Sequence, residues 1–141
     1  MSLEIKEAIG WAGGEILADK DGWRLSFYLR GPDSRYSGSW FKVEASEVPR
    51  LIEGYRSAFL RFEQISAAVP DGTKVNESKG RLTIRVGDFA AGVCMGSYHN
   101  AVGTRNSLQT VTDALTRALS RGPALVAAAR MLSQTTVLAR T

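Results

Sequence analysis

The sequence predicts an α+β fold: an antiparallel sheet of about five strands, packed on one face by two amphipathic helices and followed by a short apolar C-terminal helix. Two observations predict it. Apolar and polar residues alternate with a period of two in several short segments, which is typical of strands with one buried face. Elsewhere apolar residues recur at spacings of three and four, as on one side of a helix. Because the strand segments come in runs, they favour antiparallel pairing.

The first predicted element is a hairpin over residues 15–45, while residues 1–14 fit either a strand or a short helix. A strand ending near Ala18 is followed by the turn cluster Asp19-Lys20-Asp21-Gly22. Alternation then runs on both sides of the polar loop 31–38, so one face should be buried and the other should point outward. The outward side chains are Arg24, Ser26, Tyr28, Arg30, Trp40, Lys42 and Glu44.

An amphipathic helix is predicted over residues 46–65. Ser46 suits the N-cap, and Pro49 is tolerated in a first turn. The apolar stripe should pack against the sheet, and it comprises Val48, Leu51, Ile52, Tyr55, Phe59 and Phe62.

Residues 67–80 are predicted as a loop, and residues 80–98 as a second hairpin. Gly87-Asp88 fits a two-residue turn with glycine at its first central position. This turn places Cys94 opposite Arg81, on the face away from the core. The predicted core face comprises Leu82, Ile84, Val86, Phe89, Ala91, Val93 and Met95.

The C-terminal region is predicted as a helix over 107–121, a short helix over 123–132 and a tail over 133–141, completing a single domain over 1–141. Gly122-Pro123 should end the first helix and open the second, since glycine suits the position after a helix and proline suits a first turn. The short helix is so apolar that it must dock into the fold or meet another subunit. We expect a homodimer.

Catalytic and metal chemistry have weak support in this sequence. The only cysteine, Cys94, and the only histidine, His99, are five positions apart, which places them on opposite faces of one uninterrupted strand. A nucleophilic pair would need a bulge, which Gly96 could supply, and zinc needs three or four ligands. Nucleotide-binding and hydrolase motifs are not found. We therefore predict no catalytic residues, no metal and no cofactor.

Charge and cysteine content limit the environment. The formal net charge is +4, and the excess of positive charge lies in residues 104–141, which contain five arginines and one acid, Asp113. This excess fits either an anionic partner or ordinary helix chemistry, and helix chemistry is the favoured interpretation. A single cysteine cannot form an internal disulfide, and no apolar run approaches membrane-spanning length. We expect a cytoplasmic protein with no membrane partner.

The remaining functional signal is the outward face of the hairpins. Aromatic residues interleaved with cations suit the stacking of bases and the contact of phosphates in single-stranded nucleic acid. The candidate binding residues are Arg24, Tyr28, Arg30, Trp40, Lys42, Arg81 and Arg85.

A family resemblance is consistent with this partner. Over residues 15–65, "GWRLSFYLRG" and "GSWFKVEASEVPRLIEGYRSAF" form a hairpin followed directly by an amphipathic helix. This order resembles the sheet-then-helix unit of the Whirly and purine-rich-element-binding proteins. The resemblance implies binding of single-stranded nucleic acid on the sheet and dimerisation through helices. It rests on element order and alternation, and it transfers no binding residue.

A second class of function uses the same surface. Tyr28, Trp40 and the apolar C-terminal helix suit a protein-binding module, such as an inhibitor, an immunity-type protein or an assembly subunit, because interfaces favour aromatic residues and arginine as anchors. An enzyme of unrecognised type is the third hypothesis. A non-catalytic binding module leads.

Overall fold

The structure is a computed structural model of the 141-residue chain. It describes the backbone of residues 3–30, 38–87, 91–96 and 101–140, and the side chains of these residues except 30, 38, 39 and 135–140. Residues 31–37 of the expected loop at 31–38 lie outside this set, and its last residue, Gly38, begins a strand. The turn residues Asp88 and Phe89 and the histidine His99 also lie outside it.

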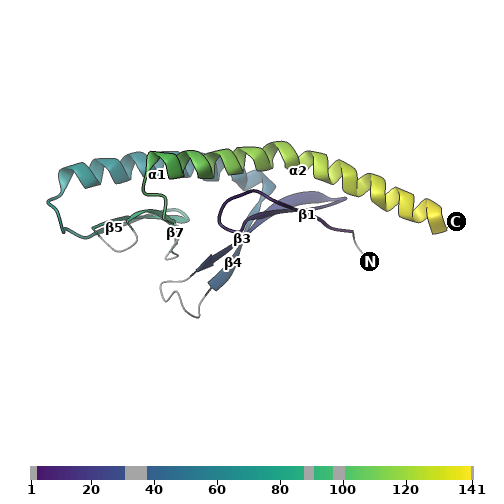
Figure 1. Ribbon diagram of the computed structural model, residues 1–141, viewed down its shortest axis with the longest axis horizontal. Coiled ribbons are helices and arrows are strands. Elements are labelled where there is room, and N and C mark those ends of the chain that lie inside the picture. Colours follow the sequence, from purple (N-terminus) through teal and green to yellow (C-terminus); the bar gives the residue numbers. More distant parts are fainter. Residues whose placement is uncertain (1–2, 31–37, 88–90, 97–100, 141) are drawn as a thin grey trace. The chain divides into compact units, whose positions relative to one another are not determined.

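The chain consists of two runs of strands, each followed by a helix, which confirms the α+β class and the antiparallel pairing. In chain order the elements are β1 (Ile5–Ala8), β2 (Glu15–Asp19), β3 (Gly22–Arg30), β4 (Gly38–Glu44), the 3-10 turn η1 (Ala45–Glu47), α1 (Val48–Ala68), β5 (Val75–Lys79), β6 (Leu82–Val86), β7 (Gly92–Met95) and α2 (Arg105–Arg140) (Figure 1).

The strands form two sheets within the described residues, in place of the single sheet of about five strands that was expected. Sheet A has the order β1-β2-β3-β4, and sheet B has the order β5-β6-β7. Each strand pairs with its neighbour in sequence because short turns connect them, as at Asp19, whose carboxylate accepts hydrogen bonds from the backbone N–H groups of Asp21 and Gly22. The long helix α1 then separates the two runs along the chain.

The chain divides into two compact units. The first comprises residues 1–28, 40–48 and 114–141, and the second comprises 29–39 and 49–113. The expectation of a single domain stays a prediction.

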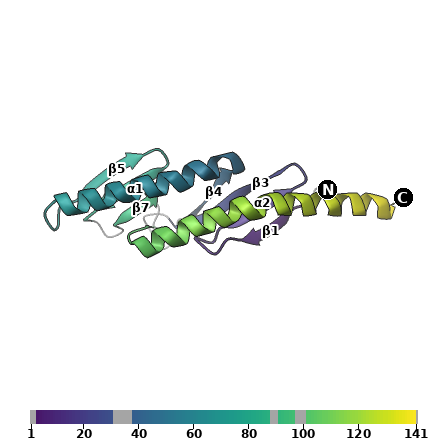
Figure 2. The same ribbon diagram turned by 90° about the horizontal axis from the view of Figure 1, so that it is seen from above.

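In the first unit, one face of sheet A packs against α2 from Ala114 onward (Figures 1 and 2). The alternation seen in the sequence explains this face, because Ile16 and Ala18 of β2 and Leu25 and Phe27 of β3 occupy alternate positions and are buried. Trp11 packs edge-on against Phe27, with ring centroids 5.4 Å apart. The core residues are Ile9, Ile16, Ala18, Leu25, Phe27, Val43, Ala114, Leu115, Ala118, Leu125, Val126 and Ala129.

The helix α2 continues through Gly122 and Pro123, so the prediction of two helices and a tail is wrong. Proline in a helix interior costs about 3 kcal/mol, since it lacks an N–H and crowds the preceding turn. Here the turns beyond it bury Leu125, Val126 and Ala129. Burying two aliphatic side chains is worth roughly 1.5–3 kcal/mol each, which offsets the cost. Gly122 serves close packing rather than helix termination.

In the second unit, α1 lies along sheet B (Figure 2). The predicted stripe is confirmed at Leu51, Ile52, Tyr55 and Phe59, which are buried. The helix starts at Val48, so Ser46 belongs to η1 instead of serving as the helix cap. Residues 75–79, expected within a loop, form the edge strand β5, which the period did not reveal because Val75 is its only apolar residue.

The pairing of β6 with β7 differs from the predicted hairpin by two residues. Arg85 is opposite Gly92 and Thr83 is opposite Cys94, so the connection is longer than a two-residue turn at Gly87-Asp88. An even shift keeps every residue on its face, which is why Val93 and Met95 are buried as expected. Ala91, predicted in the core face, is exposed because it precedes the paired residues.

Candidate functional site

The most exposed aromatic residues of the first unit lie side by side on neighbouring strands. Tyr28 of β3 is 46% exposed and Trp40 of β4 is 57% exposed. Their ring centroids are 5.2 Å apart and the ring planes are tilted by 59°. Both rings point away from the core, as the alternation predicted, because Phe27 and Val43 on the same strands are buried. A large apolar surface is therefore held open to solvent on a sheet.

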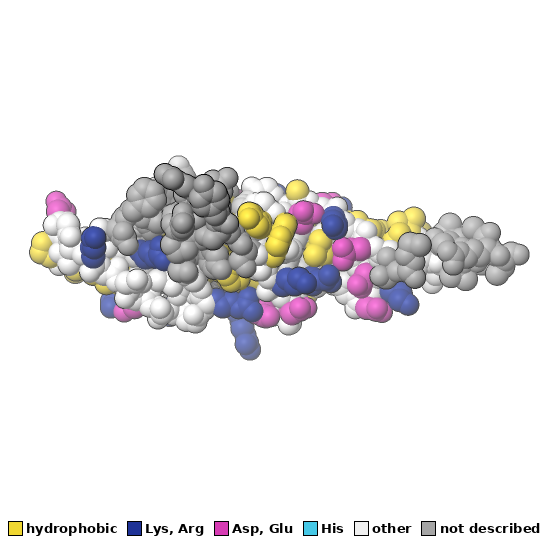
Figure 3. Space-filling model, turned by 90° about the horizontal axis from the view of Figure 1, so that it is seen from below, with side chains coloured by type: hydrophobic (Ala, Val, Ile, Leu, Met, Phe, Trp, Pro, Cys, Tyr) yellow, Lys and Arg dark blue, Asp and Glu magenta, His cyan; other side chains and the backbone are white. Residues whose placement is uncertain are grey.

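We call this side of sheet A, opposite α2, the open face. The register places Lys6, Leu17 and Arg24 side by side on it, and Glu15 beside Ser26. Ser26 is nonetheless buried, because its small side chain is covered by its neighbours. In the view of Figure 3, hydrophobic side chains lie among basic and acidic ones.

The described side chains of the open face carry nearly balanced charge. Arg24, expected as a freely available cation, is only 29% exposed and forms an ion pair with Glu4 at 3.2 Å. That pair exists because the antiparallel register brings the start of β1 towards β3, a non-local effect. Lys42 is exposed. Among the side chains that the structure describes, the charged residues of the face are Lys6, Arg24 and Lys42 against Glu4, Glu15 and Glu44.

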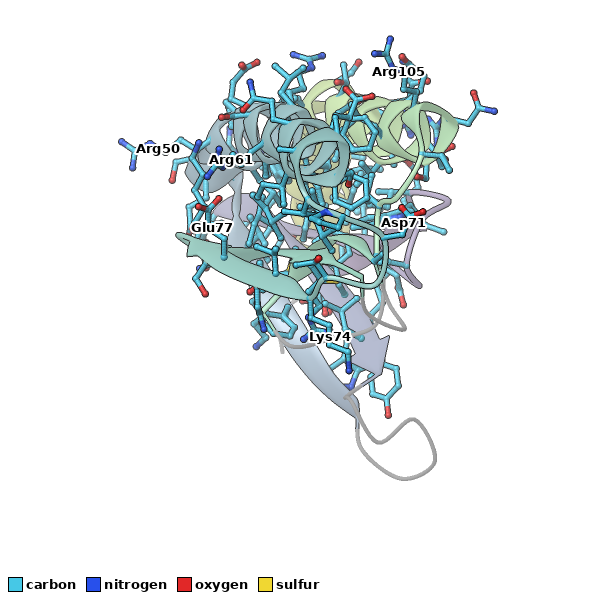
Figure 4. The ribbon with its side chains drawn as sticks, turned by 90° about the vertical axis from the view of Figure 1, so that its left-hand side faces the viewer. Arg50, Arg61, Asp71, Lys74, Glu77 and Arg105 are labelled. Carbon is cyan, nitrogen blue, oxygen red and sulfur yellow. The ribbon has the colours of Figure 1, made fainter. Side chains whose placement is uncertain are left out.

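The corresponding side of sheet B, in the second unit, has a different character. We call it the outer face; it is the side opposite α1. The register of β5 and β6 places Asn76 beside Arg85, and Ser78 beside Thr83, on this face. The one acid in the three strands, Glu77, belongs to the other side, where it binds Arg61 at 2.9 Å. Figure 4 shows Lys74 on the side of the sheet away from that ion pair.

The four arginines of α2 whose side chains the structure describes all make contacts inside one of the two units. In the first, Arg121 forms an ion pair with Glu7 at 2.8 Å, and Arg117 donates to the backbone carbonyl of Ile9 at 2.8 Å. Arg130 donates to the carbonyl of Lys20 at 2.8 Å. In the second unit, Arg105 contacts Glu63 at 3.2 Å. These four arginines contact other parts of their unit. The predicted dipole interaction of Arg121 with the end of a helix is wrong, because α2 continues to Arg140 and Arg121 lies in its middle.

Cys94 is not a surface thiol. It is fully buried, although its pairing with Thr83 places it on the outer face of sheet B. All four residues of β7 are buried, so both sides of this strand are covered. Burial, and secondarily the charge of Cys94, raise the pKa of the buried Tyr55 hydroxyl. The possible partner His99 lies outside the described residues. Within those residues, no group of three His, Cys, Asp or Glu side chains could hold a metal ion.

Only part of the predicted site comes together. Tyr28, Trp40, Arg24 and Lys42 share the open face of the first unit, whereas Arg81 and Arg85 belong to the second. The side chain of Arg30 is not described. Sequence reasoning missed Lys74 and Asn76, because they lie at and beside a strand with too few apolar residues to show a period.

Comparison with protein-family models, curated proteins and solved structures finds no match. In the part of the chain that the structure describes, no helix has the length and apolar character needed to cross a membrane. The expected cytoplasmic location stays a prediction.

Proposed function

We propose that the chain is a non-catalytic binding module that holds single-stranded nucleic acid on the open face of sheet A. The observation that carries the proposal is the exposed Tyr28–Trp40 pair. Two aromatic rings held on adjacent strands offer a platform on which unpaired bases stack, and each stacked base is worth roughly 1–3 kcal/mol. The platform accepts any base, since every base has a π face.

The element order also supports this proposal. A run of strands leads directly into α1 through the short turn η1, and a second run of strands precedes α2. This is the order on which the resemblance to Whirly and purine-rich-element-binding proteins rests. That resemblance stays a proposal, as do the binding roles of Arg24, Arg30 and Lys42.

Fluorescence titration of a short labelled oligothymidylate at low salt tests the proposal. We expect Trp40→Ala and Tyr28→Ala each to weaken binding by about tenfold, the equivalent of one lost stacking contact. Both side chains are exposed, so the variants should unfold at nearly the same urea concentration as the parent.

The matched control is Leu60→Ala, which removes a side chain that is 60% exposed on α1 of the second unit. It should bind like the parent. The proposal fails if the parent does not bind the oligonucleotide at tens of micromolar, or if Leu60→Ala weakens binding as much as Trp40→Ala.

A second candidate is a protein-binding module, and one observation favours it. Among its described side chains, the open face carries as many carboxylates as cations, which suits a protein surface better than a polyanion. The same candidate includes the expected homodimer, because Met131 and Leu132 of α2 are 68% and 48% exposed.

A further inference from the structure

The outer face of sheet B combines cations with neutral hydrogen-bonding groups and carries no carboxylate from its own strands. Along β5, side chains at odd-numbered positions point to the α1 side of the sheet and those at even-numbered positions point to the outer face. Glu77 and Lys79 face α1, where they contact Arg61 and Ser57. Asn76 and Ser78 therefore lie on the outer face, with Thr83 and Arg85 of β6 opposite them.

Two cations lie close together on this face. Asn76 is directly opposite Arg85, so Lys74, two residues earlier, is the diagonal neighbour of Arg85. Diagonal neighbours across an antiparallel pair are roughly 7–8 Å apart, within reach of long side chains. Among the residues that the structure describes, neither Lys74 nor Arg85 forms an ion pair. Like charges at this spacing repel each other, and a bound anion would relieve that repulsion.

The other groups of the face suit an oxyanion with several acceptor oxygens. The Asn76 amide can donate beside Arg85, and the hydroxyls of Ser78 and Thr83 form the next row. Arg81, at the start of β6, is exposed and continues the row of alternate positions towards the far end of the strand. Arginine offers a planar fork that matches the oxygens of phosphate. The face is thus a line of phosphate donors with no base-stacking group.

We propose that the outer face of sheet B binds the phosphate backbone of the nucleic acid, through Lys74, Asn76 and Arg85. The inference rests on the proposed function for the identity of the ligand. It assigns the two faces different tasks: the open face stacks bases, and the outer face neutralises phosphates.

An abasic oligonucleotide, a deoxyribose-phosphate chain of the same length as the oligothymidylate, separates these tasks because it has phosphates and no bases. We expect the parent chain to bind it weakly and with strong salt dependence. Lys74→Gln and Arg85→Gln should each weaken its binding by about tenfold at low salt, the equivalent of one charge-assisted hydrogen bond. Each should also lower the slope of log affinity against log salt by about 0.7, as for one lost phosphate contact on a single strand.

Matched controls remove the same charges elsewhere in the second unit. Lys79→Gln acts on the α1 side of the same sheet, and Arg56→Gln removes a guanidinium that pairs with Glu53 on α1. Neither should change the slope. Arg85→Lys keeps the charge and should keep the slope, which separates a lost contact from a distorted strand.

The results distinguish the two proposals. If the abasic chain does not bind, or if Lys74→Gln and Arg85→Gln act no more strongly than the controls, the phosphate face is wrong. If the abasic chain binds as expected but Trp40→Ala leaves oligothymidylate binding unchanged, the stacking function is wrong and the phosphate face stands.

Discussion

Gly122 of α2 lies directly against the indole ring of Trp23 in β3. A Cβ atom built on Gly122 would be 2.3 Å from two ring carbons of Trp23, far closer than van der Waals contact allows. Glycine at this position therefore permits a close approach of helix and sheet in the first unit. The same approach explains why a glycine that resembles a helix end lies in the middle of a helix.

We expect Gly122→Ala to destabilise the protein. Alanine is favoured over glycine in a helix by about 1 kcal/mol, but overpacking a rigid ring costs typically 1–3 kcal/mol, so the net change should be a loss. Urea unfolding measures it. Gly54→Ala in α1 is the matched control, because its Cβ would be 3.3 Å from a flexible methyl of Leu82. If the Gly122→Ala variant is as stable as the Gly54→Ala variant, α2 and β3 are not as close at Gly122 as we infer.

Much of the fold could be predicted from periodicity alone. The strands β3 and β4 and the helix α1 were found because each exposes one face and buries the other. The end of α2 was missed because Gly122-Pro123 is a local stop signal, and the burial of Leu125 and Val126 beyond it is a tertiary effect. The hairpin register was missed because the length of the connection after Val86 is not encoded in the alternation.

The candidate site could be predicted only where exposure follows from alternation, as for Tyr28 and Trp40. The ion pair of Arg24 with Glu4 depends on the pairing of three strands, which no local pattern reveals. Burial of Cys94 was missed because alternation identifies the face of a residue and not what covers that face. Its assignment as a small structural residue, rather than a nucleophile, agrees with that burial.

Acid should weaken the fold partly through two exposed ion pairs. Hydrogen bonds from Arg121 and Arg61 hold the pKa of Glu7 and Glu77, respectively, below the ordinary glutamate range. A carboxyl whose pKa is lower in the folded chain contributes stability above its unfolded pKa, and this contribution is lost as the pH falls through the folded pKa. We therefore expect the urea concentration at the midpoint of unfolding to fall as the pH is lowered from the ordinary glutamate pKa towards the lowered pKa of Glu7 and Glu77.

Variants of one pair test the cause. Glu7→Gln should flatten the acid-dependent fall of the urea midpoint, and Arg121→Gln should flatten it as well, because it removes the donor. Combining the two substitutions should add little, since both remove the same interaction. An undiminished acid dependence in both single variants would assign the effect to other groups.

The buried Cys94 thiol should resist alkylation. A side chain with no exposed surface reacts only when the protein opens, so modification by a small maleimide should be slow in buffer and fast in urea. Cys94→Ala should keep oligonucleotide binding. Cys94→Ser should keep binding too but lose roughly 1–3 kcal/mol of stability if its hydroxyl is buried without a partner. Rapid labelling of the native chain would show that β7 is open.

The exposed end of α2 should join two copies of the chain. Beyond Pro123, the exposed or half-exposed residues on one side of the helix are nearly all apolar: Ala124, Ala127, Ala128 and Met131, with Leu132 beside them. Apolar surface of this kind is stabilised when a second copy covers it, at roughly 25 cal/mol per Å² removed from water. We therefore expect sedimentation at micromolar concentration to show a homodimer.

Met131→Lys and Leu132→Lys should shift it to monomer by placing charges in the contact, whereas Leu60→Lys, which changes an exposed leucine of α1, should leave the dimer intact. A parent chain that sediments as a single monomeric species would contradict this interface.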